Sequence, residues 1–399
     1  MHADFLSELV KNYPTSDIRK MFVMAADYDK YPAFEKYGDW INTCNGEPNF
    51  PTPKHICEAA VASLNSGETK YHTEWGLNEL REAIAEKCNR EIAPGEYNAS
   101  HTIATTGGVG AVMLALMSII NPGDEVILPD PSYTCYEGQI LTMRGIPVRV
   151  PMYEENNFVF RAEDLEKAIT KKTKAVIINF PGNPLGSVLN REQASEIAKI
   201  VKKHNIMVIS DEVYEKIVFD GYQHFSPASI DEIRDQVILV NSFSKTYAMT
   251  GWRLGYIACT NERLNQNLYK MQQAFISCLP IFIMRAGVAA LSGPQDCVEE
   301  MRVHYERRRN LLMDGLEGIK GIVPFKPTGS FCSFINIKEL GVNSREFAEK
   351  LLKEAGVLTV AGSAFGSQGE GYLRMCFANS DENIVEACRR VREYIESNF

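Results

Sequence analysis

Short apolar runs alternate with amphipathic stretches along most of the chain. Runs rich in β-branched residues around 102–106, 125–128, 146–150, 174–180, 206–210, 237–241 and 255–259 predict buried strands. Helical spacing of apolar residues separates them, most clearly over 192–204, where Ala194, Ile197, Ala198 and Val201 would form one face. The alternation predicts an α/β fold with a mostly parallel sheet sandwiched by helices.

The two ends of the chain follow a different pattern. A long charged helix is expected over 295–318, followed by strands within 324–337 and 371–377. We therefore expect a large domain over 46–294 and a smaller α+β domain formed by residues 1–45 with 295–399. Neither an internal repeat nor a low-complexity linker divides the chain further.

Composition narrows the functional classes. A chain of 399 residues with 45% apolar content can bury a large core, and its net charge of −9 disfavours a nucleic-acid partner. The ten cysteines include no Cys-x-x-Cys pair, which argues against a zinc site or a disulfide framework and indicates a cytoplasmic protein. Apolar runs stop well short of the ~20 residues that span a membrane. The N-terminal segment 1–8 lacks the pattern of a secretion signal.

One candidate site begins where the strand around 237–241 ends. Ser242, Ser244 and Lys245 follow this strand, and Arg253 lies a few residues further on. Ligands of open α/β sheets bind at the carboxyl ends of strands. A poorly solvated lysine loses its proton readily and can then form a Schiff base, while the serines and Arg253 could hold a phosphate dianion. A solvated surface lysine is the plainer explanation of this segment taken alone.

A second strand, around 206–210, runs into Asp211 and Tyr214. A carboxylate in this position could keep the pyridine nitrogen of pyridoxal phosphate protonated. Helix capping would also account for Asp211, and an ordinary half-buried ring for Tyr214.

Two further segments are expected at the same edge of the sheet. The turn at 181–186 would point Asn183 toward it, although turn chemistry alone also explains an asparagine there. The glycines at 107–108 open an apolar helix, whose first N–H groups could face an anion.

Together these segments resemble the class I/II aminotransferases of the fold-type I pyridoxal-phosphate enzymes, and the resemblance extends through nearly the whole chain. Residues 242–255 match the Ser-x-Ser-Lys motif followed by Gly-x-Arg-x-Gly. The resemblance implies that Lys245 is the Schiff-base lysine, that Asp211 pairs with the pyridine nitrogen, and that Tyr214 and Asn183 bond the ring oxygen. It implies a phosphate-binding cup made of Gly108, Val109, Ser242, Ser244 and Arg253.

Other segments extend the resemblance to the substrate and the partner subunit. Tyr133 would stack on the cofactor ring, and Arg374 would bind the substrate carboxylate through two parallel hydrogen bonds, together with Asn183. Gly46 would offer its backbone N–H to the substrate. Tyr71 would reach the phosphate in the neighbouring subunit, which implies a homodimer with shared active sites.

The implied function is a pyridoxal-phosphate-dependent aminotransferase. It would move an amino group from an L-amino acid to a 2-oxo acid by a ping-pong mechanism, with Lys245 as the general base. Two alternatives stay open, since one fold supports many reactions. A carbon–sulfur β-lyase would release an oxo acid without an acceptor. A non-catalytic regulator that binds pyridoxal phosphate would need a DNA-reading segment, for which the chain has no basic recognition helix.

Five positions depart from the family pattern: Leu185 in place of threonine, Gly110 and Met284 in place of glutamine, Cys332 in place of tyrosine and Ala361 in place of proline. We expect most of them near the substrate or in support of it. Because the replacements are smaller or more apolar, and no second arginine is evident for a side-chain carboxylate, we hypothesise a neutral or apolar amino donor.

Overall fold

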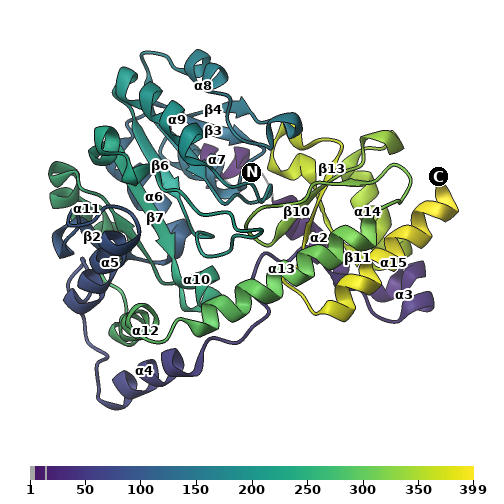
Figure 1. The fold of residues 1–399 in the computed structure, drawn as a ribbon, viewed down its shortest axis with the longest axis horizontal. Helices are drawn as coiled ribbons and strands as arrows, with labels where there is room; N and C mark the ends of the chain where they lie inside the picture. The colour runs from purple at the N-terminus through teal and green to yellow at the C-terminus, as the bar shows by residue number, and fades with distance from the viewer. Residues whose placement is uncertain (1–4, 14–15) are drawn as a thin grey trace.

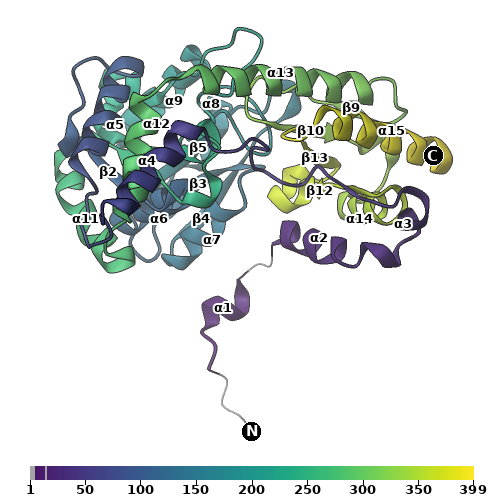
Figure 2. The same ribbon diagram turned by 90° about the horizontal axis from the view of Figure 1, so that it is seen from below.

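The computed structural model describes residues 5–13 and 16–399, so residues 1–4 and 14–15 of the predicted segment 1–45 lie outside the described residues. Two bodies of secondary structure lie side by side, and the long helix α13 (Asp296–Leu316) extends from the larger to the smaller (Figure 1). Figure 2 shows α13 and α15 along one side of the smaller body and α2 and α3 along the other. The predicted helix over 295–318 matches α13 to within two residues at each end.

The larger body contains a seven-stranded sheet in the order β2-β8-β7-β6-β5-β3-β4. Its strands are β2 (Thr102–Thr105), β3 (Glu125–Asp130), β4 (Ile146–Pro151), β5 (Thr173–Asn179), β6 (Met207–Asp211), β7 (Val237–Ser242) and β8 (Gly255–Ala258). Only the pairs that β8 makes with β7 and β2 are antiparallel, which confirms the mostly parallel sheet. The connection from β7 to β8 holds no helix longer than the four-residue α10 (Phe243–Thr246), and parallel pairing would need a full crossover.

Helices cover both faces of this sheet. Ile177, Ile209 and Ile238 share a core with residues of α6 (Gly107–Ile119), whereas the alternating positions Val176 and Val208 share another with α9 (Arg191–His204). The other helices of the larger body are α4 (Lys54–Asn65), α5 (Asn78–Glu91), α7 (Cys135–Thr142), α8 (Ala162–Ala168), α11 (Glu262–Ile276) and α12 (Ile281–Ser292). The predicted sandwich of helices and sheet is confirmed.

The boundaries of α9 follow from its sequence. At its start the Asn190 side chain accepts from the Gln193 N–H at 2.9 Å, and the Gln193 side chain accepts from the Asn190 N–H at 3.1 Å. At its end Asn205 adopts a φ of +51°, a left-handed conformation that asparagine tolerates.

The smaller body contains a four-stranded antiparallel sheet in the order β12-β13-β10-β9 and a separate parallel pair, β1 with β11. Its elements are α2 (Asp17–Ala25), α3 (Pro32–Tyr37), β1 (Ile41–Asn42), β9 (Val323–Pro324), β10 (Cys332–Asn336), α14 (Ser344–Ala355), β11 (Val357–Leu358), β12 (Val360–Ala361), β13 (Tyr372–Cys376) and α15 (Asp381–Asn398). The short helix α1 (Glu8–Asn12) projects away from both bodies (Figure 2). The pairing of β1 with β11 joins the two ends of the chain, whereas the domain boundaries at 46 and 295 stay a prediction.

The segment 324–337, which is predicted to supply strands, contains β10 and the last residue of β9. Pro327 and Gly329 lie between the two strands, and both residue types interrupt a strand. Among residues 5–13 and 16–399, no helix combines the length and the apolar character needed to cross a bilayer.

Candidate active site

A cavity of about 320 Å³ lies at the carboxyl ends of β5, β6 and β7, where α2 and β13 face the large sheet. The end of each strand contributes a side chain to it, because parallel strands end at one edge. It is lined by every predicted site residue except Tyr71, namely Gly46, Gly108, Val109, Tyr133, Asn183, Asp211, Tyr214, Ser242, Ser244, Lys245, Arg253 and Arg374. Tyr71 lies outside the cavity and is 90% exposed.

Lys245 enters the cavity from the short helix α10. The Ser242 side chain caps this helix by accepting from the Ser244 N–H at 3.1 Å. The Lys245 ammonium donates to the carbonyl oxygen of Gly46 and lies 5.4 Å from the centre of the Phe331 ring. Burial lowers the pKa of Lys245 to about 8, because the neutral amine loses less hydration than the ammonium. The site therefore favours the nucleophilic form of this amine.

Asp211 ends β6 and is buried. Its Oδ2 accepts from the Tyr136 hydroxyl at 2.7 Å, and its Oδ1 accepts from the Val213 N–H at 3.3 Å. Burial raises the pKa of Asp211 to about 6, and the hydrogen bond from Tyr136 acts in the opposite direction. A cationic partner would keep this carboxylate ionised, and a protonated ring nitrogen is such a partner.

An anion-binding arrangement surrounds the start of α6. Gly107, with a φ of +74°, brings the chain so close to Arg253 that a Cβ atom there would lie 2.6 Å from Nη2. The hydroxyls of Ser242 and Ser244 are 2.9 Å apart on the same cavity wall. Arg253 donates to the carbonyl of Thr250 at 2.8 Å and forms no ion pair with a carboxylate among the described residues. Helix N–H groups, two hydroxyls and an unneutralised guanidinium fit a phosphate.

Arg374 lies in the middle of β13, opposite Phe334 of β10, and is only 2% exposed. One Nη atom donates to Asn183 Oδ1 at 3.3 Å, and the other donates to the carbonyl of Cys44. Its Nε has no hydrogen-bond partner in the described part of the chain. A buried guanidinium without a carboxylate partner requires an anion, and the carboxylate of an amino acid supplies one.

Aromatic rings and Gly46 complete the wall. The rings of Tyr133 and Tyr136 meet edge to face, with centroids 5.5 Å apart. Tyr214 is buried and packs edge-on against Phe331 at 5.2 Å. Gly46 lies between the two cations, since its carbonyl accepts from Lys245 and a Cβ atom on it would lie 4.0 Å from Arg374 Nη1.

Sequence reasoning missed several cavity residues. Asn179 donates from Nδ2 to the Asp211 carbonyl at 2.9 Å and accepts from the Asn183 N–H at 3.0 Å. Its place at the end of a predicted strand was a usable signal. Tyr136 lies in the first turn of α7, three residues after the predicted ring of Tyr133, and this nearness in sequence was a usable signal. Phe22 of α2 lines the cavity without any sequence signal, because its segment is distant in the chain.

None of the five departures from the family pattern lines the cavity, so any effect they have on the substrate would pass through the residues that do, and that supporting role stays a prediction. A Cβ atom at Gly110 would lie 2.2 Å from Thr106 Oγ1, so a larger residue there would require the Thr106 side chain to move. Met284 lies away from the cavity, where its sulfur accepts from the Leu77 N–H at 3.3 Å. The preferred substrate side chain therefore has to be inferred from other residues.

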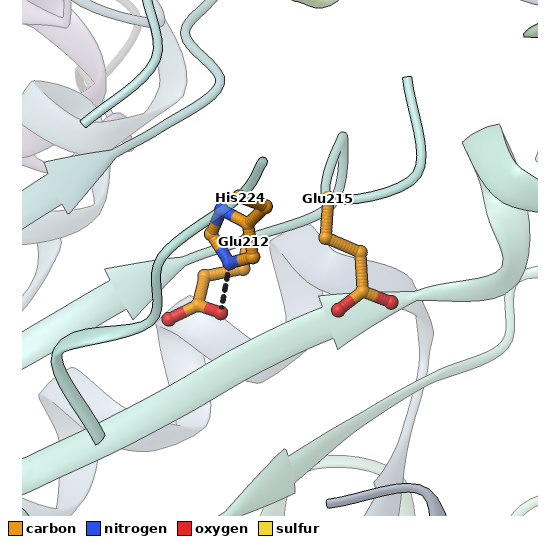
Figure 3. A group of neighbouring side chains, drawn as sticks. All are labelled: Glu212, Glu215 and His224. Atoms are coloured by element: carbon orange, nitrogen blue, oxygen red, sulfur yellow. Dashed lines mark hydrogen bonds and ion pairs between the residues drawn. The ribbon is translucent and has the colours of Figure 1, made fainter. Parts of the chain in front are cut away.

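Glu212, Glu215 and His224 form a group with metal-ligand chemistry close to Asp211 (Figure 3). His224 Nε2 and the Glu212 carboxylate are 2.6 Å apart, and Glu212 also accepts from the hydroxyls of Ser210 and Ser226, each at 2.7 Å. Glu215 pairs with the buried Lys87 at 2.7 Å. A metal ion would have to displace these partners, so we interpret the group as an internal hydrogen-bond and ion-pair network.

Comparison with known proteins gives similarity over nearly the whole chain. A model of the family described as aminotransferase class I and II matches residues 38–391. The chain is 39% identical to aromatic-amino-acid aminotransferase 2 of Thermococcus litoralis over 393 residues, covering 98% of each chain. It is 41% identical to the aspartate aminotransferase of Pyrococcus abyssi over 382 residues, covering 95% of each. The crystal structure of the aspartate aminotransferase from Rhizobium meliloti has a TM-score of 0.92 and 32% identity, with 99% of each chain covered.

Proposed function

The chain belongs to the class I and II aminotransferases and is a pyridoxal-phosphate-dependent enzyme that acts on an amino acid and a 2-oxo acid, and from this premise we propose the roles of its residues. Lys245 would hold the cofactor covalently, and Asp211 would pair with the ring nitrogen. Tyr214 and Asn183 would bond the ring oxygen, and Tyr133 would stack on the ring. The phosphate would be held by Gly108, Val109, Ser242, Ser244 and Arg253. When bound, pyridoxal phosphate supplies an aldehyde for amines and a protonated ring that takes up electrons.

The residues of the chain would divide the remaining work. Arg374 orients the amino acid by two parallel hydrogen bonds to its carboxylate, with Gly46 and Asn183 beside it. The released Lys245 Nζ takes the proton from the substrate α-carbon, since burial lowers its pKa to about 8 and a larger share of this amine is neutral than in an ordinary lysine. Asp211 holds a proton on the ring nitrogen. One observation carries the proposal: a lysine with a lowered pKa (Lys245), a buried carboxylate (Asp211) and an arginine without a carboxylate partner (Arg374) line one cavity.

Acceptor dependence tests this proposal against the lyase alternative. The purified enzyme is incubated with an L-amino acid, with and without 2-oxoglutarate, and oxo acid, ammonia and glutamate are measured. We expect continuous product formation only with the acceptor, and at most one oxo acid per site without it. Continuous release of ammonia and pyruvate from an S-alkylcysteine without an acceptor would instead support elimination.

We propose a neutral, apolar amino acid as the preferred donor. The cavity contains three basic side chains, Lys245, Arg253 and Arg374, and the roles above occupy all of them. No further lysine or arginine lines it among the described residues, whereas α2 contributes Ile18 and Phe22. A second substrate carboxylate would thus lack a counter-charge within this chain. The check is a panel of donors compared by kcat/KM, and aspartate and glutamate as the best donors would contradict the proposal.

We propose a homodimer in which Tyr71 of each subunit reaches the phosphate in the other site. Its 90% exposure in the single chain supports this role, because a large ring that exposed is free to pack against a partner. Loss of one hydrogen bond to a charged group predicts that Tyr71→Phe weakens cofactor binding by about 10-fold. Tyr222→Phe, which removes another exposed hydroxyl, is the matched control. Sedimentation that gives a monomer would contradict the proposal.

We also propose the reducing cytoplasm as the compartment. All ten cysteines are free thiols, and long-lived free thiols are typical of reducing compartments. A fluorescent fusion that localises elsewhere would contradict this proposal.

A further inference from the structure

Cys332 and Cys376 face each other across β10 and β13. They are directly opposed in the antiparallel register, and their sulfur atoms lie 3.1 Å apart. In the adjacent pair the Phe377 N–H donates to the Phe331 carbonyl at 2.9 Å. Because hydrogen-bonded and non-hydrogen-bonded pairs alternate along such a ladder, the cysteines occupy a non-hydrogen-bonded pair.

This position permits a disulfide. Cα atoms of non-hydrogen-bonded pairs are about 4.5 Å apart, and disulfides form between Cα atoms about 4.4–6.8 Å apart. The ten cysteines all lie within the described residues, and this is the only sulfur–sulfur contact among them. The buried thiols of Cys88 and Cys259 have no such neighbour and serve as internal references.

The pair adjoins the proposed substrate arginine. Residues two apart on a strand share a face, so Cys376 points to the same side of the sheet as Arg374. Cys332 lies opposite Cys376 on that face. The hydrogen bond with Cys332 is the largest cause that lowers the pKa of Cys376; burial opposes it, and the positive charges of Arg374 and Lys245 reinforce it. A thiol that ionises more readily reacts faster with peroxides.

We propose that Cys332 and Cys376 form a reversible oxidation site, at which a small hydroperoxide converts the two thiols into one disulfide. The Cys376 sulfur attacks one oxygen of hydrogen peroxide, the O–O bond breaks, and Cys376 becomes a sulfenic acid as the first water leaves. The Cys332 sulfur then attacks the sulfenic sulfur, the S–O bond breaks, and the second water leaves with the Cys332 proton. Two thiols and one peroxide thus give one disulfide and two waters.

Burial selects the oxidant. Cys332 is 0% and Cys376 3% exposed, so a disulfide oxidant as large as oxidised glutathione cannot reach either sulfur in the folded protein. Hydrogen peroxide is close to water in size and can enter through small openings of the fold.

Oxidation is expected to weaken binding of the amino acid. The sulfurs must close from 3.1 Å to the disulfide bond length of about 2.05 Å. This displacement of about 1 Å occurs two residues from Arg374, and two-point recognition of a carboxylate is sensitive to displacements of that size. The weakening rests on the role proposed for Arg374, whereas formation of the bridge does not.

The test treats the holoenzyme with hydrogen peroxide or with oxidised glutathione, blocks the remaining thiols, and maps them by mass spectrometry. We expect peroxide to produce a peptide pair joined through Cys332 and Cys376, while Cys88 and Cys259 stay blocked as free thiols. Dithiothreitol should reverse the bridge. Oxidised glutathione is expected to leave both thiols free, and equal bridging by it would overturn the assignment to a small hydroperoxide.

Kinetics test the coupling separately. Peroxide is expected to raise the KM for the amino donor by at least about 3-fold in the wild type, reversibly. The same treatment should leave the KM of Cys332→Ser unchanged from its value before peroxide. Cys259→Ser should respond like the wild type. Free Cys332 and Cys376 thiols in peroxide-treated wild type would overturn the oxidation site. A bridge with unchanged KM would overturn only its coupling to Arg374, so neither result is confused with failure of transamination itself.

Discussion

The hydroxyl of Tyr136 donates to Oδ2 of Asp211 at 2.7 Å, and both side chains are buried. This bond opposes the effect of burial on Asp211 and so favours the ionised carboxylate. Tyr136 therefore acts as a positioning residue, because it orients Asp211 and tunes its charge.

Tyr136→Phe should raise the pKa of Asp211 further above 6, since the opposing hydrogen bond is lost. We expect kcat/KM at pH 7 to fall by about 5- to 20-fold, and the acidic limb of its pH profile to move to higher pH. Tyr305→Phe removes a buried hydroxyl that has no hydrogen-bond partner among the described residues, and it should leave the profile unchanged. Identical profiles for Tyr136→Phe and the wild type would contradict this role.

Asp211→Asn should stabilise the cofactor-free protein. Burial raises the pKa of Asp211 from 3.8 to about 6, so the folded protein holds the proton of this carboxyl group more tightly than the unfolded chain does. The stabilisation that this proton provides is complete below pH 3.8 and is lost as pH rises through about 6. The variant lacks this charge, and we expect its free energy of unfolding at pH 8 to exceed that of the wild type by on the order of 1–3 kcal/mol. Urea unfolding at pH 8 and pH 5 checks this, with a smaller difference expected at pH 5. Activity should fall at least about 100-fold.

Asp235→Asn, which changes an exposed carboxylate, is the matched control for that experiment. A lower stability of Asp211→Asn than of the wild type at pH 8 would contradict the reasoning.

Capture of pyridoxal phosphate by the cofactor-free protein should depend on the protonation of Lys245. Its pKa is lowered to about 8, and only the neutral amine attacks an aldehyde. We expect the rate constant of capture to rise by up to about 10-fold per pH unit below 8 and to level off above it. Stopped-flow absorbance from pH 6 to 10 measures it. A rate that keeps rising to pH 10 would indicate an ordinary lysine.

Lys245→Ala should still bind the cofactor but lose at least about 1,000-fold in kcat, because it lacks both the covalent attachment and the base. Borohydride should fix the cofactor to the wild type and not to this variant. Lys54→Ala, which changes an exposed lysine, is the matched control. Transamination at a near wild-type rate would refute the role of Lys245.

Arg374→Lys keeps the charge and removes the two-point geometry. We expect kcat/KM for the amino donor to fall by about 10- to 100-fold, mainly through KM, because a lysine cannot make two parallel hydrogen bonds to a carboxylate. Arg389→Lys, on the exposed face of α15, should change neither constant. An unchanged KM for Arg374→Lys would remove this arginine from the site.

Much of the fold could be predicted because its signals are local. Each strand of the large sheet is a short apolar run, and α9 carries its own cap residues, Asn190 and Asn205. The two-residue strands β1, β11 and β12 could not be predicted, since so short a segment has no period. The antiparallel direction of β8 follows from a short connection whose path becomes visible only in three dimensions.

The sequence by itself determined the residue types and their places at strand ends, which is why local motifs were enough to predict Lys245, Asp211 and Arg253 as site residues. Tertiary structure decided what surrounds them. Tyr136 lies 75 residues before Asp211 in the chain, and Arg374 lies 191 residues after Asn183. Burial, hydrogen-bond partners and charge state depend on the packing of such distant segments, and no local spacing encodes that packing.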